Sequence, residues 1–398
     1  MNRVFKVFLI LLSSVIFLEV FLRIIKPKAF EFYFLQKQFH KLDKDYIVDL
    51  EPNVDVIVKH FLGTFQMKFS TNSLGFRASR ELQANQKKIL CIGDSVTMGF
   101  GVNDEDTFCK KLDGFQNSKG EIYQTLNLGV DAYGPTNVYH KLKKYIPILK
   151  PELIYYFPST GDDVDEIVQE QKNKSPLKKK LFEIQFQLSK YSYSFLALKI
   201  FSEQIQFRFK ETFIYPFIRT MNELDCLKGD KTSDCRVNPY SDLFNSFKED
   251  FFVPEKGIPA NEKFPVFSEK ECEENKTEFK IPEIAIASMD KIRELGQKEK
   301  IKIVYFLAPI DIETAYCSSK EKKIHRYYKY LEVLKKYLES NQEDYIDLNQ
   351  YTHEMIFGKE NSFNPRPYYI LGDGHYTKLG NEWVYKHLLQ KTNEVLKD

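Results

Sequence analysis

The stretch Lys88-Ile-Leu-Cys-Ile-Gly-Asp-Ser-Val-Thr-Met-Gly-Phe-Gly-Val102 guides the interpretation of the whole chain. Its apolar run, residues 89–92, is typical of a buried strand and stops at Gly93-Asp94-Ser95. The residues that follow can begin a helix, with Asp94 or Ser95 placed to cap it. Such a strand–turn–helix junction lifts Ser95 to the carboxyl end of a sheet and points backbone N–H groups at a bound ligand. Ser95 is therefore a candidate nucleophile if a base reaches it, and otherwise an ordinary N-cap serine.

A motif near the C-terminus favours the nucleophile. The segment Leu371-Gly-Asp-Gly-His-Tyr-Thr-Lys-Leu-Gly380 sets His375 two residues after Asp373 in a glycine-flanked loop, ahead of a final helical pattern. Taken with Gly93-Asp94-Ser95-Val96-Thr97, this loop resembles the SGNH (GDSL-type) esterase and acyltransferase superfamily. The first block of that family is a Gly-Asp-Ser signature, and its last block is an aspartate–histidine element followed by a glycine.

Two further blocks of the family have counterparts in the middle of the chain. Asn127-Leu-Gly129 matches the block whose glycine N–H joins the oxyanion hole, and Gly161-Asp162-Asp163 falls where the family has Gly-x-Asn or Gly-Asn-Asp. The four blocks occur in the family's order. The resemblance covers about residues 70–165 and 285–395.

The pattern of apolar segments predicts an α/β fold. Strand candidates alternate with helical stretches such as residues 136–148, which argues for a parallel sheet covered on both faces. The expected architecture is a three-layer α/β/α sandwich around a central, mostly parallel sheet of about five strands, flavodoxin-like as in SGNH proteins. Ligands of such sheets bind at the carboxyl ends of the strands, where the four blocks converge. The strand candidates are residues 89–92, 123–128, 153–157, 301–307 and 345–348.

The resemblance implies acyl transfer through a catalytic triad. Ser95 would attack an acyl carbonyl, His375 would take the serine proton and later return one to the leaving group, and Asp373 would orient His375. Backbone N–H groups of Ser95 and Gly129 would form the oxyanion hole, each donor contributing about 3–4 kcal/mol. We expect His325 and His353, the alternative bases, to be surface residues.

Asp162 departs from the family pattern, because the family has an asparagine that donates an N–H to the oxyanion at this position. An ionised carboxylate only accepts hydrogen bonds. Asp162 is therefore either a protonated donor, a residue turned away to cap the following turn, or a sign that the site is silent. We favour the turn-capping role.

The N-terminal segment predicts a membrane anchor. Residues 7–18 form an uncharged apolar run behind two basic residues, and no small-residue cleavage site or lipobox cysteine follows. We favour an uncleaved signal-anchor over a cleaved signal peptide, with Glu19 and Arg23 spaced to pair. The family resemblance then implies an extracytoplasmic domain.

The chain divides into five expected regions. Residues 177–220 within the insertion are helical, basic and aromatic, which suits either a lid or membrane-surface element or an added helical layer on the core; we favour the layer. Residues 221–284 look loop-like. The regions are 1–28, the anchor; 29–87, a stalk and a β-hairpin centred on Leu62-Gly63; 88–165, the first part of the SGNH domain; 166–284, the insertion; and 285–398, the second part of the SGNH domain.

The cysteines and the charges limit the alternatives. Cys226 and Cys235 are spaced for a disulfide, and Cys272 and Cys317 are a second candidate pair, whereas Cys91 is expected to be a buried apolar residue. No clustered ligand motif or glycine-rich nucleotide loop occurs, so we expect no metal and no cofactor. A formal net charge of +2 gives no reason to expect nucleic-acid binding.

The acceptor of the acyl group is not specified by these residues. Water as acceptor would make the chain an acyl ester hydrolase, which we favour on fold-level analogy. A sugar hydroxyl would make it a cell-envelope glycan O-acetyltransferase, and a catalytically silent envelope or binding protein is the third alternative. The expected partners are an acyl-ester or O-acylated glycan substrate and the membrane.

Overall fold

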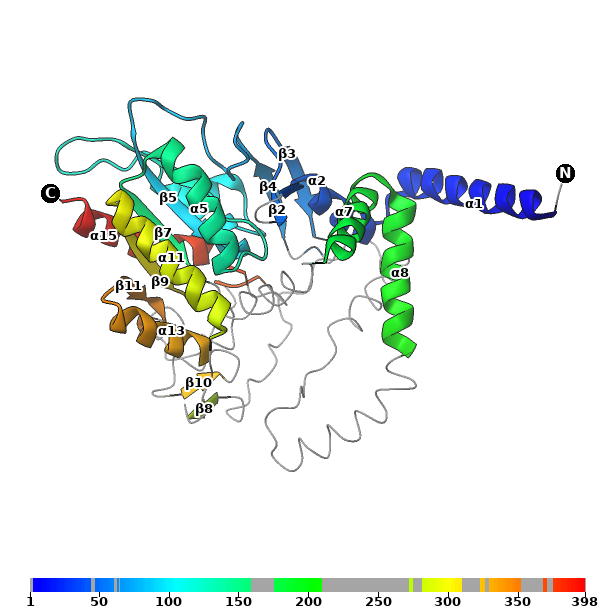
Figure 1. Cartoon of the computed structure of the whole chain (residues 1–398). Helices are drawn as coiled ribbons and strands as arrows, with labels where there is room; N and C mark the ends of the chain where they lie inside the picture. Colours follow the sequence, from blue (N-terminus) through cyan, green and yellow to red (C-terminus); the bar gives the residue numbers. More distant parts are fainter. Residues whose placement is uncertain are drawn as a thin grey trace, which may run out of the picture. The chain divides into compact units, whose positions relative to one another are not determined.

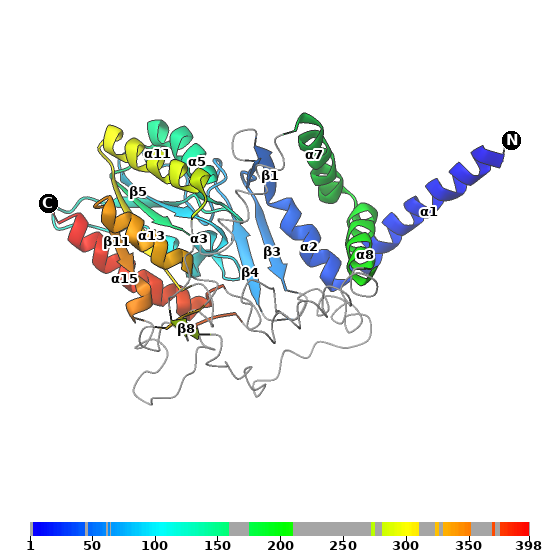
Figure 2. The ribbon, with the colours of Figure 1, turned by 60° about the horizontal axis from the view of Figure 1, so that its bottom comes forward.

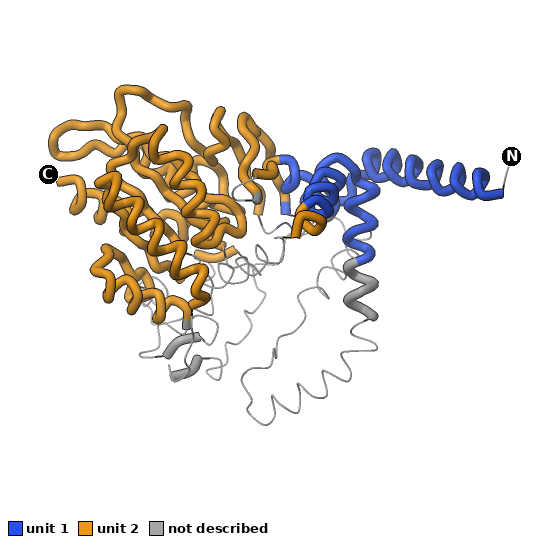
Figure 3. Tube along the Cα trace, viewed as in Figure 1, with its two compact units in different colours: residues 1–38, 60–63, 180–259 blue, residues 39–59, 64–179, 260–398 orange. Residues whose placement is uncertain are grey.

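In a computed structural model of the protein, the chain divides into two units (Figure 3). Unit 1 comprises residues 1–38, 60–63 and 180–259, and unit 2 comprises residues 39–59, 64–179 and 260–398. The residues that the structure describes are 3–43, 47–60, 63, 65–158, 175–209, 272–274, 281–309, 323–325, 329–351, 368–370 and 375–397.

Unit 2 is built on a parallel sheet of five strands in the order β11-β9-β7-β5-β6 (Figure 1). All four neighbouring pairs are parallel, and the five strands coincide with the five predicted ones to within two residues at either end. The predicted α/β class is therefore confirmed. The strands are β5 (Lys87–Gly93), β6 (Tyr123–Asn127), β7 (Leu153–Phe157), β9 (Lys302–Leu307) and β11 (Asp344–Asp347).

Helices cover both faces of this sheet, as the buried character of the central strands requires. Figure 2 shows α5 (Pro135–Leu149) and α11 (Glu283–Glu299) on one face and α15 (Lys378–Val395) on the other. Helix α4 (Phe108–Leu112) packs with α15 in one apolar cluster with β5, β7 and β9. A hydrogen bond joins helix α13 (Lys329–Ser340) to α11, because the Tyr337 hydroxyl donates to Asp290 at 2.7 Å. The result is the expected three-layer sandwich.

The segment ahead of the sheet contains regular structure. The predicted hairpin is confirmed as β3 (Asp55–Lys59) paired antiparallel with β4 (Gln66–Ser70). Residues 29–53 are expected to be a stalk, but they contain a helix and the pair β1 (His40–Asp43) and β2 (Ile47–Leu50). The pair is tied down because Lys141 Nζ lies 2.6 Å from Asp49 Oδ1 and both side chains are buried.

The described part of unit 1 contains helices around a small apolar cluster of Leu22, Phe30 and Tyr193. The predicted ion pair within the first helix is confirmed, with Arg23 Nε 2.7 Å from Glu19 Oε1. The helices are α1 (Arg3–Ile25), α2 (Lys28–Gln38), α7 (Pro176–Tyr191), whose first four residues belong to unit 2, and α8 (Tyr193–Phe209).

The remaining short elements lie in unit 2, and most of the predicted disulfide positions are outside the described residues. Cys226, Cys235 and Cys317 are not described, and Cys272 is described only as part of a strand backbone. Cys91 is fully buried, as predicted. The short elements are α3 (Ser95–Met98), η1 (Asp104–Asp106), η5 (Leu348–Tyr351), and the antiparallel pair β8 (Cys272–Glu274) and β10 (Lys323–His325).

Candidate active site

The chain turns sharply at the carboxyl end of β5, and glycine is required at this turn. A Cβ atom at Gly93 would lie 2.5 Å from the Phe157 carbonyl oxygen and 2.3 Å from Thr97 Oγ1. Directly after it, the buried Asp94 caps α3, because its Oδ1 accepts a hydrogen bond from the Val96 N–H at 2.9 Å. The predicted capping role of Asp94 is therefore confirmed, and Ser95 is the first residue of the helix.

Helix α3 rests against the end of strand β6. A Cβ atom at Gly129 would lie 2.4 Å from Met98 N and 2.8 Å from Thr97 C, so the two backbones meet only because this residue is glycine. Asn127 closes the same contact, since its Nδ2 donates to the Thr97 carbonyl at 2.8 Å and its Oδ1 accepts from the Gly129 N–H at 3.0 Å. An oxyanion at this N–H would therefore compete with the Asn127 side chain.

His375 is held at the start of α15 by a backbone bridge. Tyr369 and Tyr376 pair antiparallel across the loop, and the Ile370 N–H donates to the His375 carbonyl at 2.9 Å. Both tyrosine hydroxyls donate to the Pro309 carbonyl, that of Tyr369 at 2.8 Å. These contacts fix the backbone on both sides of the histidine to the end of β9.

The helix that follows His375 starts at a regular cap. Thr377 Oγ1 accepts from the Gly380 N–H at 3.3 Å, and a Cβ atom at Gly380 would lie 2.4 Å from the Tyr368 carbonyl oxygen. The spacing of Thr377 and Gly380 thus provides a cap and a close backbone approach.

Two segments far apart in the sequence meet at the carboxyl ends of the sheet strands. His375 Nε2 lies 2.8 Å from Ser95 Oγ, across 280 positions of sequence. Both residues are half-buried. The Phe100 ring packs on the imidazole with centroids 4.9 Å apart. A neutral imidazole with its free lone pair on Nε2 can accept the serine proton in this geometry.

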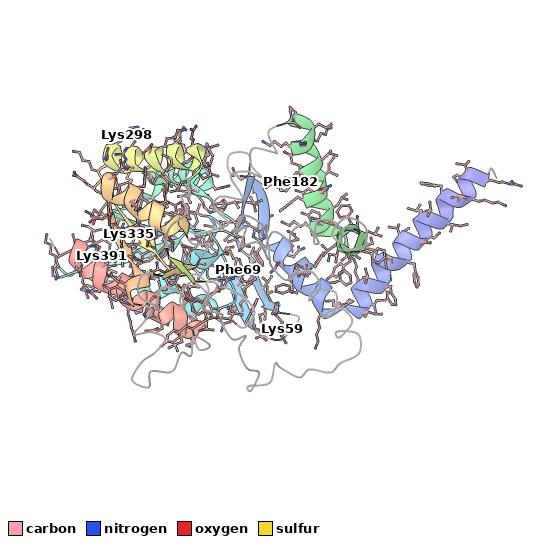
Figure 4. All side chains as sticks on the ribbon, turned by 90° about the horizontal axis from the view of Figure 1, so that it is seen from below. Lys59, Phe69, Phe182, Lys298, Lys335 and Lys391 are labelled. Carbon is pink, nitrogen blue, oxygen red and sulfur yellow. The ribbon has the colours of Figure 1, made fainter. Side chains whose placement is uncertain are left out.

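Arg77 holds the segment that follows α3. Its guanidinium is fully buried, pairs with Asp104 at 2.8 Å, and donates to the carbonyls of Val102 and Lys68 at 2.9 and 3.0 Å. The guanidinium also lies 4.1 Å above the ring of Phe69, which is labelled in Figure 4. Burial lowers the Arg77 pKa, and the Asp104 carboxylate opposes that shift. Arg77 therefore links strand β4 to the segment 99–104 that follows α3.

The structure brings together some of the predicted site residues and leaves others undescribed. Ser95, His375 and Gly129 lie at one edge of the sheet, whereas Asp373 and Asp162 fall outside the described residues. His353 also falls outside, and only the backbone of His325 is described. Within the described ranges, no group of three or more His, Cys, Asp or Glu residues could hold a metal ion.

The sequence patterns missed Phe100 and the two tyrosines. Phe100 lies just after the capping Gly99 of α3, and nothing in the local pattern marks it as a neighbour of a histidine near the other end of the chain. The two tyrosines flank a glycine-containing stretch in the sequence, and this placement is the signal that could have predicted their antiparallel pairing.

No family model matches the sequence, and the search of curated proteins finds no match. Among solved structures, a lipolytic protein assigned to the G-D-S-L family from Desulfitobacterium hafniense is similar, with 10% identity, a TM-score of 0.35, and coverage of 77% of this chain and 99% of that chain. An acetyl xylan esterase is similar with 14% identity, a TM-score of 0.36, and coverage of 76% and 98%.

A lipase/acylhydrolase from Enterococcus faecalis is also similar, with 12% identity, a TM-score of 0.35, and coverage of 78% of this chain and 98% of that chain. These proteins include members of the family that the sequence motifs resemble.

Proposed function

We propose that this chain is a serine-dependent acyl ester hydrolase of the SGNH type. The single observation that supports the proposal is the 2.8 Å separation of His375 Nε2 and Ser95 Oγ at the carboxyl edge of the parallel sheet. A serine within hydrogen-bond reach of a histidine is the minimal arrangement for nucleophilic acyl transfer. The buried Asp94 cap, the half-buried Thr377 cap and the close backbone approaches at Gly93, Gly129 and Gly380 hold these side chains in place, which argues against a chance surface contact.

The proposed reaction has two halves. Ser95 Oγ attacks the ester carbonyl while its proton moves to His375 Nε2, and His375 then gives that proton to the leaving alkoxide. Water attacks the resulting acyl-serine in the same way, with His375 as base, and releases the carboxylic acid. In this scheme Asp373 holds the histidine tautomer, and the Ser95 and Gly129 N–H groups stabilise the oxyanion.

Asp162 keeps its proposed role as a turn-capping residue that does not donate to the oxyanion. Because the Gly129 N–H already donates to Asn127 Oδ1 at 3.0 Å, that amide oxygen would have to release the N–H as the oxyanion forms. Glycan O-acetyl transfer uses the same first half-reaction, with a sugar hydroxyl in place of water, and remains the alternative.

The N-terminal helix supports a proposal about location. Helix α1 (Arg3–Ile25) is apolar and long enough to cross a membrane, since its 23 residues span about 35 Å. We propose that α1 anchors the protein and that the serine site lies outside the cytoplasm. An intact N-terminus in carbonate-washed membranes is the expected result, and a mature form that starts near residue 25 would contradict it.

Covalent labelling tests the proposed activity directly. A serine-directed fluorophosphonate should label the wild-type protein, and Ser95→Ala should not be labelled. Gln185→Ala, an exposed change on α7 in unit 1, is the control and should be labelled normally. An unlabelled wild type that also turns over no ester in water and no glycan acceptor would favour the silent alternative. Labelled protein that transfers acyl groups to glycan hydroxyls faster than to water would favour the transferase.

A further inference from the structure

Helix α7 carries an apolar stripe that no described residue covers. Five side chains spaced three and four apart lie between 42% and 69% exposed, and this spacing places them on one face of the helix. The five are Leu177, Leu181, Ile184, Leu188 and Tyr191, called here the α7 stripe.

The stripe is not the face by which α7 packs in its unit. Phe186 and Ser189 are buried on the opposite side of the helix, and Phe182, labelled in Figure 4, packs against Phe186 with ring centroids 6.3 Å apart. Helix α7 is therefore apolar on two faces. A helix of a water-soluble layer is expected to be polar on its outer face, and this one is not.

The end of α7 is fastened to the last turns of α1. Arg23 donates to the Tyr191 carbonyl at 2.8 Å, which satisfies one of the free carbonyls at the end of α7. The Glu19 carboxylate accepts from the Ser194 N–H at 2.8 Å and the Tyr193 N–H at 3.2 Å, and so caps α8. The corner between α7 and α8 thus lies beside the final turns of the apolar helix.

We infer that the α7 stripe rests on the surface of the same lipid bilayer that α1 enters. This inference rests on the proposal that α1 lies in a membrane and is independent of the esterase activity. The apolar side chains of α1 are exposed along most of the helix, and the hydrogen bonds of Glu19 and Arg23 place the end of the stripe next to that surface. One apolar phase then covers both surfaces.

The charges near the stripe suit a bilayer with anionic headgroups. Lys178, Lys179 and Lys180 are exposed near the start of α7. Amphipathic helices that lie in the interface combine an apolar face with lysines of this kind. A second copy of the chain, with a formal net charge of +2, provides no net attraction for three adjacent lysines. The bilayer is therefore the occupant that accounts for both the stripe and the charges.

Tryptophan fluorescence in vesicles tests the inference on the full-length protein. The chain has one tryptophan, so Trp383→Phe gives a silent background in which Leu188→Trp reports on the stripe. The protein is reconstituted in phosphatidylcholine–phosphatidylglycerol vesicles whose acyl chains carry bromine near the headgroup. Leu188→Trp should show blue-shifted emission that bromine quenches. Gln185→Trp, exposed on a different face of the same helix, should keep the emission of a water-exposed tryptophan.

A third reporter separates failure of the anchor from failure of the stripe. Phe17→Trp, on the exposed face of α1, should be quenched if α1 is inserted. Quenching of Phe17→Trp without quenching of Leu188→Trp would overturn the inference, and so would equal quenching of Leu188→Trp and Gln185→Trp. Lack of quenching at Phe17→Trp would overturn both the inference and the anchor. Replacing Lys178, Lys179 and Lys180 by Gln should reduce quenching of Leu188→Trp in anionic vesicles, with little change in purely zwitterionic ones.

Discussion

The two sides of the candidate site are held in place by different means. The nucleophile turn, residues 93–99, is fixed by contacts of backbone with backbone and by short polar caps: Gly93 and Gly129 meet neighbouring backbones, and Asp94 caps α3. The base loop, here residues 368–370 and 375–380, is fixed by aromatic side chains and by a carbonyl that lies about sixty residues earlier in the chain. The comparison shows that backbone contacts position the serine, whereas hydroxyl groups that share one distant acceptor position the backbone beside the histidine.

This difference has a consequence for how each side tolerates change. A close approach of two backbones cannot relax without moving the helix that carries Ser95. A tyrosine hydroxyl that shares its acceptor with a second tyrosine can be lost while the acceptor stays satisfied. We therefore expect a Cβ atom at a close backbone approach to reduce activity sharply, and the loss of one tyrosine hydroxyl in the base loop to reduce it only slightly.

The largest expected effect is the loss of activity when either Ser95 or His375 is replaced. Ser95→Ala and His375→Ala should each reduce kcat/KM for an activated acyl ester by about 10⁴-fold or more, because proton transfer between them is part of one step. The double variant should lose little beyond either single variant. Steady-state rates of the three purified variants provide the measurement. Additive losses would show that the two residues do not act together, despite the 2.8 Å contact.

A matched pair of glycines compares the sides more directly. Gly129→Ala would place a Cβ 2.4 Å from Met98 N, so α3 must shift; we expect a destabilisation of about 1–3 kcal/mol and a fall in kcat of about 10²-fold. Gly380→Ala would place a Cβ 2.4 Å from the Tyr368 carbonyl and should disturb the base loop by a similar clash.

Gly296→Ala is the control for these two variants. Its Cβ would meet the flexible end of Ile303, at 2.7 Å, on a helix that carries no site residue. It should reduce the free energy of unfolding without changing kcat of the folded enzyme. Chemical denaturation and kcat are measured for all three variants. Full kcat in Gly129→Ala would contradict the view that the contact with Met98 positions Ser95.

Sequence alone predicted the nucleophile turn because its determinants lie close together in the chain. An apolar run that stops at a glycine gave β5, and an aspartate one residue before the helix gave the cap. The other strands of the sheet were predicted for the same reason, since buried parallel strands are continuous apolar runs bounded by polar residues.

The rest depended on pairings that no local pattern specifies. The structure of residues 29–53 was missed because the pair β1–β2 is stabilised by the buried contact of Asp49 with Lys141, which is on α5. The contact of Phe100 with His375 and the shared acceptor of Tyr369 and Tyr376 were missed for the same reason. The role of Gly129 was only partly anticipated, because its close approach to α3 and its bond to Asn127 depend on the relative position of two strands.

The smallest expected effect tests the gradual failure of the base loop. Tyr376→Phe removes one hydroxyl from the Pro309 carbonyl, but the Tyr369 hydroxyl still donates to it at 2.8 Å. Because the buried acceptor keeps a partner, we expect a loss of only about 1 kcal/mol in the free energy of unfolding and a nearly unchanged kcat. Tyr369→Phe should behave in the same way.

The double variant removes both hydroxyl donors from a buried carbonyl, so its loss should exceed the sum of the two single losses by about 1 kcal/mol or more. Urea denaturation of the four proteins closes the cycle, and kcat of each reports whether His375 has moved. Strict additivity would mean that the two hydroxyls act independently. A large fall in kcat for Tyr376→Phe alone would mean that the base loop is as intolerant as the nucleophile turn, and the contrast between the two sides would not hold.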